Sequence, residues 1–144
     1  MESFYNNITV INNSKKFSLK NAETQLNWGK WVDNSGSPSN PPTNLAAGDT
    51  ATFQVEGRNS SSSGSDAAVT YTVWDNVLNE AAGTIKFSFS CPYSGSNTAA
   101  CSNSSSLTHT LYTKINSTDD WGNEGAVPES GHPLYIKYTL SDPT

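Results

Sequence analysis

Apolar and polar residues alternate with a period of two along most of this chain. Ile85, Phe87 and Phe89, for example, are separated by Lys86 and Ser88. Because successive side chains of a β-strand point to opposite faces, this period predicts strands with one buried and one solvated face. The alternating segments are residues 4–10, 22–28, 51–55, 69–73, 85–89, 107–115 and 134–140. Such strands are typical of antiparallel sheets packed face to face, so the sequence predicts an all-β fold, an antiparallel β-sandwich of about seven to nine strands.

Polar stretches rich in Gly, Pro, Ser and Asn separate these segments and predict the loops. The sequence Asn12-Asn13-Ser14 predicts a hairpin turn, and the consecutive Pro41 and Pro42 exclude a central strand. Residues 76–82 are the one helix candidate, and they are too few to predict a helix. The longer loops are expected at 34–43, 58–66, 92–106 and 117–132. Since neither a repeat nor a linker divides the chain, residues 1–144 are expected to form a single domain.

The composition agrees with a β fold and excludes several function classes. Ser, Thr and Asn supply 53 of the 144 residues, which disfavours a helical bundle. The net charge is −5 and the eight basic residues are scattered, which argues against nucleic-acid binding. No apolar run approaches the roughly 20 residues that span a bilayer. The segment Met1-Glu2-Ser3-Phe4 lacks the basic start of a secretory signal, so we expect cytoplasmic synthesis and release without a signal peptide.

Candidate catalytic groups are few. His109 is in phase with Leu107 and Leu111, so we expect it to point inward, whereas His132 between Gly and Pro is expected to be an exposed loop residue. The acidic residues within 119–124 do not follow the spacing of a calcium loop. The sequence therefore predicts no catalytic residue, metal site or cofactor, and a protein that is not an enzyme.

The two cysteines, Cys91 and Cys101, have nine residues between them. They could form a disulfide in an oxidising compartment or remain a reduced pair, and the sequence leaves both alternatives open.

The aromatic residues carry more functional information. Trp28 is in phase with Leu26 and is expected in the core. Trp31, Tyr93 and Trp121 follow or precede Gly, Pro or polar residues in predicted loops, where either packing or surface recognition would suit them. Tryptophan and tyrosine combine an apolar ring with a polar edge, which suits membrane interfaces, sugar faces and protein contacts.

Three segments resemble those of a known family. Residues 26–31, Leu-Asn-Trp-Gly-Lys-Trp, resemble the Ser-Trp-Gly-Lys segment of the aegerolysins. Residues 56–59, Glu-Gly-Arg-Asn, are similar to their Cys-Gly-Arg-Ser segment. Residues 89–97, Phe-Ser-Cys-Pro-Tyr-Ser-Gly-Ser-Asn, resemble their Trp-Asp-Cys-Pro-Trp-Gly-Ser-Lys-Thr-Asn segment and the Pro-Phe-Ala-Gly-Ser-Asn stretch of related bacterial insecticidal proteins. The order and approximate spacing agree over residues 8–140.

The resemblance implies a non-enzymatic β-sandwich that binds sphingolipid-containing membranes and acts with a larger pore-forming partner. This chain departs from the family's motifs at Tyr93, where the family has Trp, and at Glu56, where it has Cys. Trp31 matches some members only. The residues expected to contact lipid, from these motifs and from the loop aromatics, are Trp28, Lys30, Trp31, Arg58, Tyr93 and Trp121.

We therefore expect a protein that binds sphingolipid-type head groups or lipid domains as part of a cytolytic system. Arg58 or Lys30 could hydrogen-bond a phosphate, an aromatic face could hold a choline or ethanolamine cation, and Trp31 and Tyr93 could anchor at the interface. A carbohydrate-binding lectin is the second hypothesis. A small hydrolase built from distant carboxylates is the third, and a structural role remains a fourth.

Overall fold

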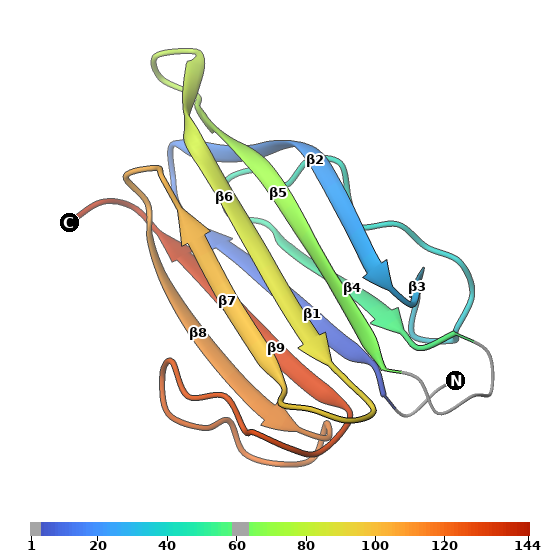
Figure 1. Ribbon diagram of the computed structural model, residues 1–144. Helices are drawn as coiled ribbons and strands as arrows, with labels where there is room; N and C mark the ends of the chain where they lie inside the picture. The colour runs from blue at the N-terminus through green and yellow to red at the C-terminus, as the bar shows by residue number, and fades with distance from the viewer. Residues whose placement is uncertain (1–3, 59–63) are drawn as a thin grey trace.

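The computed structural model describes residues 4–58 and 64–144, which form two β-sheets packed face to face (Figure 1). The strands are β1 (Asn6–Asn13), β2 (Phe17–Trp28), β3 (Lys30–Val32), β4 (Thr50–Glu56), β5 (Ser65–Asp75), β6 (Glu80–Cys91), β7 (Thr98–Asn103), β8 (Thr108–Ile115) and β9 (Leu134–Ser141). One sheet has the order β3-β4-β1-β9-β8 and the other β2-β5-β6-β7. The predicted all-β sandwich is confirmed.

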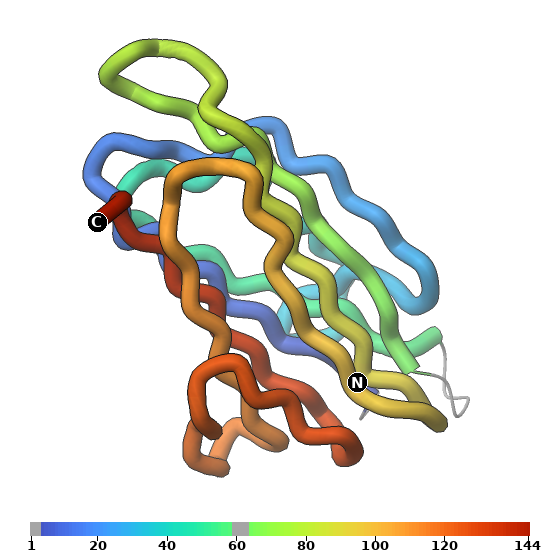
Figure 2. Tube along the Cα trace, turned by 60° about the vertical axis from the view of Figure 1, so that its left-hand side comes forward, coloured from blue at the N-terminus to red at the C-terminus, as the bar shows by residue number. Residues whose placement is uncertain are grey.

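The first and last strands of the chain pair in the middle of the five-stranded sheet. β1 pairs antiparallel with β4 and parallel with β9, while all other strand pairs are antiparallel. Figure 2 shows the blue N-terminal strand beside the red C-terminal strand. This pairing places Phe4 and the β8–β9 loop at the same end of the sandwich.

The core lies between the sheets and is built from the inward positions of the alternating segments. Its two buried tyrosines have their hydroxyl groups satisfied: the Tyr138 hydroxyl donates to the Ser88 carbonyl at 2.8 Å, and that of Tyr71 to the Pro42 carbonyl at 2.7 Å. The Tyr138 bond also joins the two sheets. The fully buried residues of largest volume include Tyr71, Tyr138, Phe87, Phe89, Ile8, Leu19, Ile85, Leu134, Ile136 and Leu140.

One strand lies where the sequence predicts a loop. β7 falls within residues 92–106 and forms the edge of the four-stranded sheet. Only Ala99 and Cys101 of this strand pack against the core, and its other residues are polar or small. An edge strand paired on one side needs few apolar residues, so its alternation is too weak to find in the sequence.

The segment 76–82 is not helical. A carboxylate oxygen of Asp75 accepts the backbone N–H groups of Val77 and Leu78, at 2.9 and 3.0 Å, and Asn79 has a φ of 56°. These contacts close a tight turn between β5 and β6. The turn projects beyond the sandwich (Figure 1).

The structure contradicts the prediction for one histidine and confirms that for the other. His109 was expected to point inward, and this expectation is wrong, because His109 is exposed at the start of the edge strand β8. It keeps the parity of Leu111, yet its side chain is exposed although Leu107 is buried and so is Leu140, the residue with which His109 pairs on β9. His132 is exposed in the β8–β9 loop, as predicted. No helix in the part of the chain that the structure describes could cross a bilayer.

Candidate functional site

The segment 28–31 divides its two tryptophans between the surface and the core. Gly29 links β2 of one sheet to β3 of the other, with a φ of +115°. A Cβ atom at this position would lie 2.4 Å from the Glu56 carbonyl oxygen, so only glycine fits here without strain. The chain therefore changes sheets within one residue, and Trp28 and Trp31 belong to different sheets.

Trp28 is exposed, which corrects the expectation that it lies in the core. The β2–β5 register shifts between Leu26 and Trp28, so that Trp28 pairs with Asp66. Such a bulge turns the following side chain to the other face of the strand. The Trp28 side chain is 45% exposed, and even Leu26, which keeps the inward parity, is 39% exposed at this sheet edge.

Trp31 is a core residue and not an interfacial anchor, which corrects a second expectation. It is 8% exposed, and its ring packs edge-on against Phe53 and Phe89, each at 6.1 Å between centroids. β3 pairs with β4 on the inner side of the Gly29 turn. This places the Trp31 ring between the sheets.

One cationic side chain, Arg58, lies beside Trp28, and a second, Lys30, pairs with Glu56. The Arg58 guanidinium carbon is 4.4 Å from the centroid of the Trp28 ring, and the Arg58 Nε donates to the Gly29 carbonyl at 3.4 Å. Lys30 Nζ lies 3.5 Å from a carboxylate oxygen of the buried Glu56. Stacking on an indole restricts the orientation of the guanidinium.

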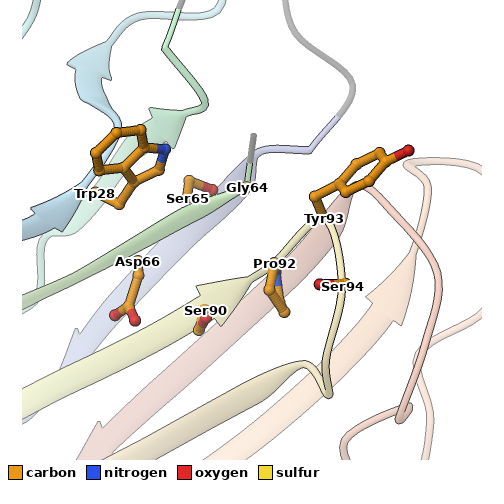
Figure 3. A pocket seen from close by; sticks show the side chains of 8 residues that line it. All are labelled: Trp28, Gly64, Ser65, Asp66, Ser90, Pro92, Tyr93 and Ser94. Carbon is orange, nitrogen blue, oxygen red and sulfur yellow. The ribbon is translucent and has the colours of Figure 1, made fainter. Parts of the chain in front are cut away.

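A groove of about 410 Å³ opens between Trp28 and the loop that carries Tyr93 (Figure 3). In Figure 3 the two aromatic rings lie on opposite sides, and Asp66, Ser90 and Ser94 lie below them in this view. The groove is lined by Trp28, Gly64, Ser65, Asp66, Ser90, Pro92, Tyr93 and Ser94. It combines aromatic walls with polar groups that are mostly hydrogen-bond acceptors or hydroxyls.

Gly64 brings the two sides of the groove together. A Cβ atom on Gly64 would lie 2.4 Å from the Cα of Pro92 and 2.7 Å from the Tyr93 backbone nitrogen. A larger residue at this position would push the Tyr93 loop away from β5. The sequence did not identify Gly64 or Asp66 as site residues, because both fall in residues 58–66, which it predicts to be a polar loop.

Tyr93 is held by contacts at its base while its ring faces solvent. The side chain is 57% exposed and packs edge-on against Phe4, with 5.3 Å between centroids. Phe4 in turn stacks on His132 at 3.9 Å. The buried Asn97 ties the same loop to the β8–β9 loop, donating from Nδ2 to the Gly131 carbonyl at 2.9 Å. The loop therefore presents Tyr93 from a fixed base.

Trp121 lies elsewhere, so the structure does not bring all the predicted residues together. Lys114 and Lys137 place their Nζ atoms 4.5 Å from the centroid of its ring. These lysines belong to β8 and β9 of the five-stranded sheet, whereas the groove lies at the end of β5 and β6. Trp28, Arg58 and Tyr93 therefore form one candidate site, and Trp121 is outside it.

The two cysteines are free thiols. Cys101 on β7 pairs with Phe87 on β6. Phe87 is four residues from Cys91 along β6, and at the rise of a strand this separates their Cα atoms by about 13 Å. Disulfides need Cα atoms within about 7 Å, so the disulfide alternative is not realised in this fold. Burial raises the pKa of Cys91 to about 11 and that of Cys101 to about 12, which keeps both thiols protonated at neutral pH.

The groove's chemistry suits a ligand that carries both charges. A carboxylate with aromatic rings nearby favours an ammonium group, and the stacked guanidinium favours a phosphate or carboxylate. The described residues contain no group of three metal-ligating side chains.

Comparisons with known proteins place the chain among β-sandwich proteins. A family model described as Aegerolysin matches residues 4–128. No curated protein matches the sequence. The structure is similar to that of IP-1A from Alcaligenes faecalis, with a TM-score of 0.60 and 22% identity over 99% of this chain and 95% of that one.

Two further solved structures share the fold. The RahU protein, solved in complex with a Tris molecule, has a TM-score of 0.53 and 19% identity, over 97% of this chain and 96% of that one. The lipid-binding protein Nakanori has a TM-score of 0.57 and 8% identity, over 98% of this chain and 72% of that one.

Proposed function

The chain belongs to the aegerolysin family, and from that premise we propose that it binds membrane lipids through the groove between Trp28 and Tyr93. The observation that carries the proposal is the exposure of these two rings on either side of a polar depression. Exposed aromatic residues in such an arrangement can bury their rings at a membrane interface while the polar groove receives a head group. The shared fold of a protein described as lipid-binding supports the same class of ligand.

The charges of the groove favour a zwitterionic head group. Arg58 would hydrogen-bond the phosphate, and the Asp66 carboxylate with the Trp28 ring would hold the quaternary or primary ammonium. Lys30 is half exposed but already paired with Glu56, so its contribution to phosphate binding is smaller. We infer that the preferred lipids are sphingolipids with a phosphocholine or phosphoethanolamine head group, as the family resemblance implies.

The same resemblance implies a larger pore-forming partner, and we propose that the chain acts as the membrane-recognition component of such a pair. Its own contribution would be affinity for one lipid composition. The partner would then supply the segment that crosses the bilayer.

A carbohydrate is the second candidate ligand of the groove. The groove combines the Ser90 and Ser94 hydroxyls and the Asp66 carboxylate with two aromatic rings, and sugars are bound by this combination of groups. The family to which the chain belongs favours a lipid, so the zwitterionic lipid is the preferred proposal.

Vesicle co-sedimentation tests the proposal. Vesicles of phosphatidylcholine alone are compared with vesicles that contain sphingomyelin or ceramide phosphoethanolamine, each with and without sterol, and a glycan array is run in parallel. We expect binding to the sphingolipid vesicles and its loss in Tyr93→Ala and Arg58→Gln, with Lys86→Gln as the matched charge control, because Lys86 lies on β6 outside the groove lining. Equal, negligible sedimentation with every composition would contradict lipid binding, and selective array signals would favour the sugar.

A further inference from the structure

A second group of aromatic and cationic residues lies on the outer face of β8 and β9. Lys114 Nζ and Lys137 Nζ are each 4.5 Å from the centroid of the Trp121 ring. Lys137 is also 5.3 Å from the Tyr112 ring, and Lys114 is 5.9 Å from the Tyr135 ring. These five residues are called the Trp121 cluster here.

Strand register explains why the cluster forms. Tyr112 pairs with Lys137 and Lys114 pairs with Tyr135, so lysine and tyrosine alternate diagonally on one face. Side chains at such cross-strand positions contact each other directly. The inward neighbours Leu111 and Thr113 are buried, and the cluster residues therefore face outward.

The loop that carries Trp121 is fixed against the edge of β8. Gly122 N–H donates to the Thr113 carbonyl at 3.0 Å, and Gly125 N–H to the Leu111 carbonyl at 2.8 Å. The Thr113 hydroxyl returns a bond to the Ala126 carbonyl at 2.8 Å. The Trp121 ring is therefore positioned before any ligand arrives, although its side chain is still 36% exposed.

The two ammonium groups repel each other. Both lie 4.5 Å from one centroid, so their separation is at most twice that distance. Neither lysine forms an ion pair with a carboxylate of the described residues. Asp119 and Asp120 line a shallow depression beside Lys114 without pairing to it. An anion between the lysines would offset this repulsion with two attractions.

Glu124 of the same loop already has a role. One of its carboxylate oxygens accepts the Leu111 backbone N–H at 3.2 Å, at the edge of β8. Lys114 donates to the Ser117 carbonyl at 2.9 Å and keeps further N–H donors. The cluster thus contains cationic donors beside three aromatic rings.

We propose that the Trp121 cluster is a second binding site, for a saccharide that carries a carboxylate or sulfate group. The anionic group is held by Lys114 and Lys137, and the apolar face of the sugar ring packs on Trp121 or a neighbouring tyrosine. The cluster shares no residue with the groove, so the two ligands bind independently. A chain with a net charge of −5 offers no general attraction to such saccharides, which makes local recognition by two lysines necessary.

Titration calorimetry with the full chain tests the proposal. The probes are a heparin hexasaccharide, 3′-sialyllactose and, as the uncharged reference, lactose, at low and at 150 mM salt. We expect binding of at least one anionic probe and none of lactose. The double variant Lys114→Gln/Lys137→Gln should bind that probe at least tenfold more weakly, and Lys114→Arg/Lys137→Arg should retain it. The matched control Lys15→Gln/Lys86→Gln removes the same charge outside the cluster and should bind as the wild type does.

The outcomes separate this site from the groove. Trp28→Ala should keep saccharide binding, and the Gln double variant should keep vesicle binding. Absence of binding of every anionic probe by the wild type would overturn the proposal, as would an equal loss in the control double variant. Thermal unfolding of each variant identifies misfolding. If the Gln double variant is misfolded, Trp121→Phe, which keeps a ring, and Trp121→Ala are titrated instead. Wild-type affinity in Trp121→Phe together with loss of binding in Trp121→Ala supports the site, and any other result contradicts it.

Discussion

Replacing the two tryptophans of segment 28–31 one at a time separates surface recognition from packing. Trp31 is 8% exposed and packs on Phe53 and Phe89, so Trp31→Ala removes a buried ring and leaves a cavity. Tryptophan-to-alanine changes in cores cost about 3–5 kcal/mol. A stability of about 5–15 kcal/mol is usual for a domain, so this variant should be severely destabilised or unfolded.

Trp28→Ala should have the opposite profile. The ring is 45% exposed, and of a side-chain area of roughly 250 Å² this leaves about 110 Å² to bury at a membrane. At 25 cal/mol per Å² the contribution to binding is about 2.8 kcal/mol as an upper value. Loss of the ring should therefore weaken vesicle binding by about 10- to 100-fold. Its contact with Arg58 contributes about 0.5–1 kcal/mol to folding, so stability should fall by little more than that.

Urea unfolding followed by tryptophan fluorescence, and sedimentation with sphingomyelin vesicles, measure the two effects. Trp28→Phe is the matched control, because it keeps an aromatic ring and should retain most of the binding. A Trp31→Ala variant as stable as the wild type would refute the assignment of Trp31 to the core. A Trp28→Ala variant with unchanged vesicle affinity would refute the groove as the lipid site.

Three further predictions follow from local contacts. Burial raises the pKa of Cys91 from 9.0 to about 11, so the stability that its protonated thiol contributes is full below pH 9 and is lost as the pH rises to 11. The free energy of unfolding should fall by about 2–3 kcal/mol over this range. Urea unfolding of Cys91→Ala should show a smaller decline between the same pH values. Gly29→Ala should destabilise the fold by about 1–3 kcal/mol in the same assay, because its Cβ would meet the Glu56 carbonyl at a positive φ; an unchanged midpoint would contradict this. Asn97→Ala should speed hydrogen exchange in the Tyr93 loop and weaken vesicle binding several-fold, and unchanged exchange would show that the Gly131 bond does not hold the loop.

The sequence by itself determined the fold class. Alternation at a period of two requires one buried and one solvated face on each strand, and only paired sheets satisfy that pattern over so many segments. It also indicated the family, through motifs that include Trp28, Arg58 and Tyr93. The edge strand β7 was not predicted, because a strand with one neighbour needs little apolar patterning.

Only the tertiary structure decided which aromatic residues are accessible and which charges they meet. Trp28 and Trp31 lie three residues apart in similar local sequence, yet a bulge and the Gly29 crossover place one at the surface and the other between the sheets. Asp66 joins the groove only through strand pairing, and Trp121 is drawn to the β8–β9 face by bonds of its loop to Thr113. Parity fixes a side chain's face only within an uninterrupted strand. Bulges, sheet changes and loop docking depend on contacts between residues distant in sequence, and a pattern of neighbours does not contain them.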